Sequence, residues 1–163
     1  MRDGMVVHKN HVAFWGGAFS NFYPCKFVVD GVEYISSEQY FMAQKALYFN
    51  DEEIHRQILN SKNPKDAKSL GRKVANFNAD EWMEVCEEKM YEGVYAKFSQ
   101  NEDLKAFLLD DEFKGKGFVE GSPIDGIWGV KIYYDSPNID DENNWNGLNL
   151  LGKVLDKVRE ELK

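Results

Sequence analysis

The chain has 163 residues, of which 43% are hydrophobic, and it carries a formal net charge of −8. This length and apolar fraction predict one globular domain over residues 1–163 and exclude a disordered chain. The negative charge excludes an extended nucleic-acid surface, because such a surface needs clustered lysines and arginines; a local basic pocket stays open.

The cysteine content and the hydropathy pattern indicate the compartment. Cys25 and Cys86 have no metal-like spacing and are expected to be reduced thiols of a cytoplasmic protein. We see no signal peptide and no run of about 20 apolar residues, so no membrane contact is expected. His8 and His11 lack further ligands, so we expect neither a metal nor another cofactor. The oligomeric state is left open.

The first third of the chain changes from strand to helix signals. Residues 12–35 are expected to be extended, with a hairpin turn at Asp30-Gly31. Ser36 and Gln39 then form a capping box, which predicts a helix that runs to about Phe49.

Helix signals continue through the middle of the chain. Asp51 is expected to start a second helix, and Asn63-Pro64 a third that stops near Gly71. Asp80 is expected to cap a longer amphipathic helix, and a short helix is expected at 102–109.

The last third mixes short extended pieces with a final helix. Residues 117–120 and 127–132 should be extended on either side of the Ser122-Pro123 turn, and residues 133–145 should form a surface loop. Leucines and a valine at helical spacing predict a terminal helix that includes Leu148. The predicted class is therefore α+β, mainly helical, with a small antiparallel β element near the N-terminus.

Two charged residues on the first predicted helix are the leading candidates for chemistry. Glu38 falls at the second helical position, where free N–H groups favour an ionised carboxylate that can act as a base or stabilise an oxocarbenium ion. Lys45 lies seven residues further, on the same stripe, and can bind a phosphate or a leaving base. The alternatives are an ordinary acid at a helix start and a solvated lysine.

A second group of candidates follows the Ser-Pro turn. Asp125 can act with Glu38, or it can simply hydrogen-bond nearby backbone. Trp128 can stack on a nucleobase or belong to the core, where Phe19, Phe22 and Phe41 are also expected. The weaker candidates are Asn21, Trp15, Tyr40, Arg72 and Glu120.

Five ordered blocks resemble the NADAR family, also called YbiA-like. They lie at residues 19–22, 36–45, 70–72, 122–129 and 147–152. The resemblance implies a mostly helical α+β fold and N-glycosidase activity. Family members release ribose 5-phosphate from ribosylamino-pyrimidines of riboflavin synthesis, or remove ADP-ribose from modified guanine in nucleic acid. Val130 and Leu148 depart from the family pattern, and Leu148 stands where a basic residue is common.

The resemblance places Glu38, Lys45, Asp125 and Trp128 on motif positions of the family. The leading hypothesis is a metal-independent hydrolase of a phosphorylated N-riboside or of ADP-ribosylated guanine. Glu38 and Asp125 are the catalytic candidates, and the division of roles between them stays open. The predicted substrate-binding residues are Asn21, Tyr40, Lys45, Arg72, Glu120, Trp128 and Trp15. The alternative is a non-catalytic module that binds ADP-ribose or a nucleotide.

Overall fold

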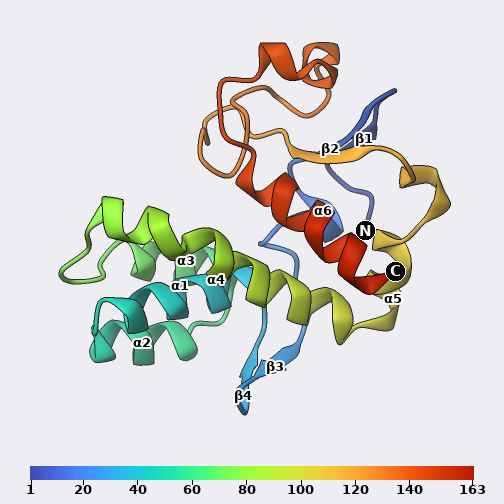
Figure 1. The fold of residues 1–163 in the computed structure, drawn as a ribbon. Coiled ribbons are helices and arrows are strands. Elements are labelled where there is room, and N and C mark those ends of the chain that lie inside the picture. Colours follow the sequence, from blue (N-terminus) through green and yellow to red (C-terminus); the bar gives the residue numbers. More distant parts are fainter. The chain divides into compact units, whose positions relative to one another are not determined.

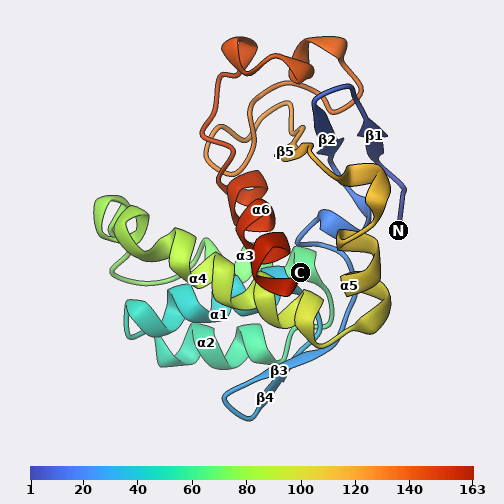
Figure 2. The ribbon, with the colours of Figure 1, turned by 45° about the vertical axis from the view of Figure 1, so that its right-hand side comes forward.

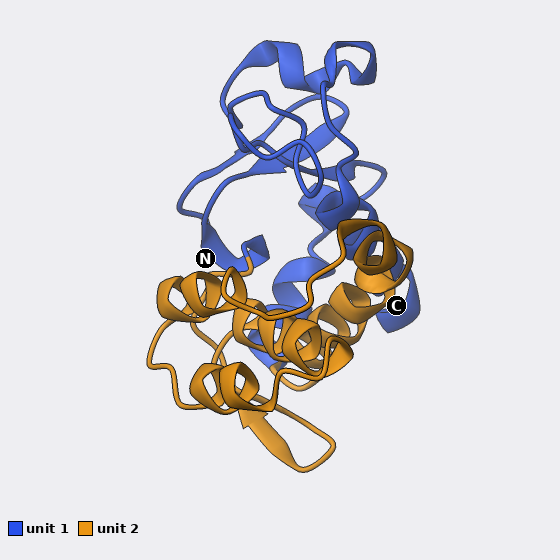
Figure 3. Cartoon of the chain, turned by 90° about the vertical axis from the view of Figure 1, so that its left-hand side faces the viewer, with its two compact units in different colours: residues 1–20, 102–163 blue, residues 21–101 orange.

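The computed structural model describes residues 1–163, which form six helices and five strands. The chain divides into two compact units, coloured separately in Figure 3. Unit 1 comprises residues 1–20 and 102–163, and unit 2 comprises residues 21–101. The single domain predicted over residues 1–163 stays a prediction. No helix is long and apolar enough to cross a membrane.

Unit 2 is a group of four helices with a β-hairpin. Helix α1 packs against the other three helices (Figures 1 and 2). The elements are β3 (Phe27–Val29), β4 (Val32–Tyr34), α1 (Ser37–Tyr48), α2 (Glu52–Leu59), α3 (Pro64–Gly71) and α4 (Ala79–Ser99). Gly93 allows α4 to approach α1, because a Cβ atom there would lie 2.5 Å from the Tyr40 ring.

The hairpin and the start of α1 follow directly from local sequence. β3 and β4 pair antiparallel, and Asp30 and Gly31 both have positive φ, as a tight hairpin turn requires. Ser36 Oγ accepts a hydrogen bond from the Gln39 N–H at 3.0 Å. Gln39 Oε1 accepts from the N–H of Ile35 at 2.9 Å, one residue before the usual capping-box partner. The predicted hairpin and helix start are confirmed.

The remaining caps of unit 2 agree with the sequence except at α4. Asp51 caps α2 and Asn63 caps α3, as predicted. The cap of α4 is Asn78, whose side-chain oxygen accepts from the Glu81 N–H at 3.0 Å. The prediction that Asp80 is the cap was wrong, because Asp80 already lies in the first helical turn.

Unit 1 combines a three-stranded sheet with two helices. Its elements are β1 (Met5–Val7), β2 (His11–Phe14), α5 (Glu102–Leu108), β5 (Gly117–Glu120) and α6 (Leu150–Leu162). The strand order is β1-β2-β5, with β1 and β2 antiparallel but β2 and β5 parallel (Figure 2). Helix α6 packs against β5. The predicted mainly helical class and the antiparallel elements near the N-terminus are confirmed.

Aromatic side chains fill much of the unit 1 core. The Phe19 ring has its centroid within 6 Å of four other phenylalanine rings, from β2, α5, β5 and the Asp111–Phe113 turn. These are Phe14, Phe107, Phe113 and Phe118. A smaller cluster of Ala13, Val119, Val130 and Ile139 lies beside the sheet. The family departure at Val130 is therefore a core position.

Two expectations for the last third need correction. Residues 127–132 form bends and not a strand, because Lys131 has a positive φ and a side chain organises the preceding turn. Leu148 lies outside α6 and is exposed, since Asn149 adopts a left-handed conformation just before the helix. The expected surface loop at 133–145 is present, and it contains two short 3-10 turns, Pro137–Asp140 and Glu142–Asn144.

Candidate active site

Glu38 lies at the positive end of α1 in unit 2. It is the second residue of the helix, and its side chain is largely buried, at 8% exposure. Its N–H donates to the backbone oxygen of Asn21 at 3.1 Å. Asn21 Oδ1 accepts from Ser37 Oγ at 2.8 Å. The loop around Asn21 is therefore bonded to the first turn of the helix that carries Glu38.

Lys45 stands in the last turn of α1, in the electrostatic field of two other predicted residues. Burial lowers the pKa of Lys45, the Glu38 carboxylate raises it, and the Arg72 guanidinium lowers it further. Glu38 and Arg72 therefore both act electrostatically on Lys45, and all three residues lie within unit 2. A half-buried ammonium beside a guanidinium is suited to bind a phosphate.

Exposed aromatic rings accompany the cations of this unit. Lys45 Nζ lies 4.3 Å from the ring centroid of Phe77, and Lys68 Nζ lies 5.7 Å from that of Phe22. Phe22 and Phe77 are both exposed, so the prediction of a core position for Phe22 was wrong. Sequence reasoning missed Phe77, because it lies between helices, in a segment without a motif or periodicity.

Tyr40 is placed in the core of unit 2. Its ring is 2% exposed and packs edge-on against Tyr34, with centroids 5.0 Å apart. Its hydroxyl donates to Glu92 at 2.9 Å. Burial and the Glu92 carboxylate raise the pKa of Tyr40 well above its ordinary value. A nucleobase has no access to this ring, so the structure does not support the predicted substrate-binding role of Tyr40 and gives it a structural one.

Asp125 organises the loop that carries Trp128 in unit 1. Its Oδ1 accepts hydrogen bonds from the N–H groups of Ile127 and Trp128, both at 2.9 Å. The N–H of Asp125 donates to Ser122 Oγ at 3.0 Å. One carboxylate oxygen of Asp125 therefore hydrogen-bonds nearby backbone, which is one of the two interpretations that the sequence left open. Trp128 is half-buried.

Glu120 and Trp15 lie at the carboxyl ends of the parallel strands β5 and β2. Glu120 ends β5 and pairs in register with Phe14, so Trp15 follows directly. A Cβ atom at Gly129 would lie 2.9 Å from the backbone oxygen of Glu120 and 3.1 Å from its Oε2. The glycine therefore lets the 125–129 loop lie close against Glu120. The Trp15 ring is 43% exposed and contacts Tyr133 edge-on.

The nine predicted residues thus fall into two groups, one in each unit. Unit 2 holds Asn21, Glu38, Tyr40, Lys45 and Arg72, and unit 1 holds Trp15, Glu120, Asp125 and Trp128. Sequence reasoning also did not predict that Lys97 of α4 is buried, at 1% exposure. Nothing in its local sequence separates it from the other helical lysines.

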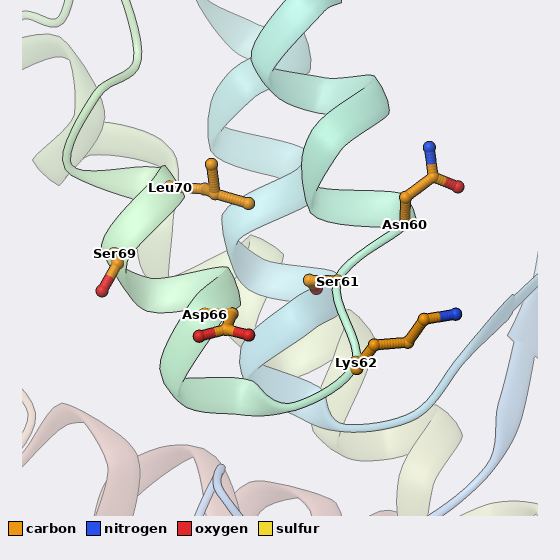
Figure 4. Close-up of a pocket in the computed structure, with 6 residues that line it drawn as sticks. All are labelled: Asn60, Ser61, Lys62, Asp66, Ser69 and Leu70. Carbon is orange, nitrogen blue, oxygen red and sulfur yellow. The ribbon is translucent and has the colours of Figure 1, made fainter.

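The surface has two hollows. One, of about 350 Å³, is lined by residues 60–62, which follow α2, and by α3, and Figure 4 shows its six residues. The other, of about 460 Å³, lies between residues 109–115 and the end of α6. Neither lining includes a predicted site residue, so the hollows do not define the candidate site. No three His, Cys, Asp or Glu side chains are grouped to bind a metal ion.

Comparison with known proteins decides the family. Residues 11–163 match the model of the NADAR domain. The chain belongs to the NADAR family. This confirms the resemblance found in the five sequence blocks.

Relatives of this NADAR protein occur in animals, viruses and bacteria. It is 41% identical to protein irg-1 of Caenorhabditis elegans, over 94% of this chain and 80% of that protein. It is 43% identical to an N-glycosidase of Acanthamoeba polyphaga mimivirus, over 88% of this chain and 86% of the relative. A riboflavin biosynthesis protein of Vibrio vulnificus is 34% identical over 90% of this chain, which covers 36% of that longer protein.

A solved structure has the same fold. The NMR structure of Escherichia coli YbiA aligns with a TM-score of 0.75 and 31% identity, over 99% of this chain and 89% of that chain. The predicted YbiA-like fold is therefore confirmed. The roles of the individual site residues stay predictions.

Proposed function

We propose that this protein is an N-glycosidase that hydrolyses a bond between ribose and nitrogen. The observation that carries the proposal is Glu38, which is buried at the positive end of α1 and acts electrostatically on Lys45 of the same helix. Membership of the NADAR family and the N-glycosidase name of the mimivirus relative support it.

The chemistry needs one carboxylate near the anomeric carbon. The C1–N bond breaks, and the base leaves with the bonding electron pair and takes up a proton from solvent. A positive charge develops on the sugar, and an ionised Glu38 stabilises it. Water then adds to C1 and gives one proton to the carboxylate, which returns it to solvent. The products are the sugar with a free hydroxyl at C1 and the released amine or base.

The other groups bind the substrate. Lys45 and Arg72 supply the positive charge for a phosphate on the ribose. Within unit 1, Trp128 and Trp15 offer rings on which a base can stack, whereas Tyr40 of unit 2 cannot do so from the core. Asp125 orders the Trp128 loop through its bonds to Ile127 and Trp128. We therefore propose that Glu38 is the catalytic carboxylate and that Asp125 has a supporting role.

Two substrates share the required chemistry. One is a phosphorylated ribosylamino-pyrimidine, a free intermediate of riboflavin synthesis, and the riboflavin biosynthesis name of the Vibrio relative supports it. The other is ADP-ribose attached to guanine. The net charge of −8 favours the small free molecule. We further propose that residues 1–163 act as one domain and that the protein works in the cytoplasm, as its cysteine usage indicates.

The direct test is a mass-spectrometric assay of the purified protein with both substrate types. We expect release of ribose 5-phosphate from the pyrimidine riboside, or of ADP-ribose from modified guanine. Calorimetry with ADP-ribose on the same sample provides the comparison. Binding without release of sugar from either substrate would contradict hydrolysis and favour a non-catalytic binding module.

A further inference from the structure

Phe77 presents an exposed ring to the side chain of Lys45. The ring is 46% exposed, and Lys45 Nζ lies 4.3 Å from its centroid. A cation within about 6 Å of an aromatic centroid is attracted by the ring quadrupole. Phe49 contacts the same ring edge-on, with centroids 5.3 Å apart. The ring of Phe77 therefore contacts both the buried ring of Phe49 and the ammonium of Lys45.

The segment before Phe77 is fixed by a side chain from α2. One carboxylate oxygen of Asp51 caps that helix at Ile54, and the other accepts the N–H of Ala75 at 2.8 Å. Both backbone hydrogen bonds lower the pKa of Asp51, so its carboxylate stays ionised over a wide pH range. Asn76 then takes a left-handed conformation, with φ of 60°. The ring of Phe77 thus projects from a turn that a hydrogen bond to Asp51 holds in place.

The surroundings of Lys45 do not all favour its charged ammonium. Burial and the Arg72 guanidinium both lower its pKa, which means that they disfavour the charged ammonium. Glu38 acts in the opposite direction. An aromatic face adds attraction without removing the charge that a phosphate needs.

We propose that Phe77 is a positioning residue that holds the Lys45 ammonium in place to bind the phosphate of the substrate. The inference rests on the phosphate-binding role proposed for Lys45. Without the ring, the flexible lysine chain turns into solvent, away from Arg72. Phosphate binding then weakens, while the bond-breaking step at Glu38 is little changed.

The experiment compares Phe77→Leu with Phe77→Trp, which restores an aromatic face. Tyr95→Leu, at an exposed aromatic position of α4 without a cation over it, is the matched control. We expect Phe77→Leu to raise KM about threefold to tenfold and to change kcat less than about twofold. Phe77→Trp and Tyr95→Leu should stay near wild type. A thermal melt of each variant checks that it is folded.

A second readout does not depend on turnover. Protein labelled with ¹³C at the lysine ε-carbons gives a Lys45 signal that is assigned by its loss in Lys45→Arg. We expect the ring current of Phe77 to shift this signal upfield in the wild type, and the shift to vanish in Phe77→Leu but not in Tyr95→Leu. A wild-type signal at the position of a solvated lysine, unchanged in Phe77→Leu, would overturn the inference.

The two proposals can fail separately. A wild-type protein that hydrolyses neither substrate would refute the proposed function. Calorimetric Kd values for ribose 5-phosphate then replace KM, and weaker binding in Phe77→Leu with a lost shift would still support the positioning role. Equal Kd values in wild type and Phe77→Leu would overturn it.

Discussion

Burial of the Lys97 ammonium lowers the free energy of unfolding. It lies on α4 at 1% exposure, and its Nζ is 5.0 Å from the ring centroid of Phe98 and 5.7 Å from that of Tyr23. Removal from water penalises the ammonium, so burial lowers the pKa of Lys97 from 10.5 to about 8. The two rings offset only part of the lost hydration.

This lowered pKa predicts a pH dependence of stability. Between pH 8 and 10.5 the unfolded chain binds more protons at this position than the folded one, so the free energy of unfolding rises with pH there. The contribution is about 3 kcal/mol across that window. Urea unfolding of wild type and Lys97→Met at pH 8 and at pH 10.5 measures this contribution.

The comparison with Lys97→Met isolates this residue from the other titrating groups. We expect the stability of the wild type relative to Lys97→Met to increase towards high pH. Lys26→Met, at an exposed position of the same unit, is the control. An unchanged difference between wild type and Lys97→Met across the window would contradict the account.

Single residues were predictable where local backbone chemistry places them. Glu38 follows from the capping box, since the Ser36 cap fixes where the helix starts. Tyr40 and Phe77 could not be placed, because burial of one ring and exposure of the other depend on packing between helices. The sequence shows that both are aromatic but not which face each presents.

At the scale of elements, two substitutions at the start of α4 test which residue caps this helix. Asn78 accepts from the Glu81 N–H, whereas Asp80 lies within the first turn. We expect Asn78→Ala to lower the free energy of unfolding by about 1 kcal/mol, in the range of 0.5–2 for lost caps. Asp80→Ala should cost less than about 0.5 kcal/mol, because it weakens only the helix-dipole interaction. Equal costs, measured by urea unfolding, would contradict the assignment of the cap.

Elements held by local signals were predictable, and those held by distant partners were not. The Asp30-Gly31 hairpin and the caps of α1, α2 and α3 depend on residues within a few positions. The parallel pairing of β2 with β5 joins segments about 100 residues apart, and no periodicity encodes it. Residues 127–132 have strand-like composition, but the hydrogen bonds of Asp125 bend their start.

For the whole molecule, the distribution of potential ligands predicts how activity responds to chelation. No three His, Cys, Asp or Glu side chains are grouped to bind a metal, and the paired His11 and Asp140 bond each other at 3.1 Å. We expect hydrolysis to retain its rate in EDTA within about twofold, since a carboxylate can support the cationic sugar without a metal. Loss of activity in EDTA, restored by one divalent ion, would show a missed site.

The central claim is that Glu38 takes part in breaking the ribosyl–nitrogen bond. The most direct measurement is turnover and thermal stability of Glu38→Gln on one sample, with Glu33→Gln, at an exposed position of β4, as the control. The exchange is nearly isosteric, so stability should change by less than about 1–2 kcal/mol. Turnover should fall about 100-fold or more, because the neutral amide cannot stabilise the oxocarbenium ion. A folded Glu38→Gln protein with near wild-type turnover would contradict the account.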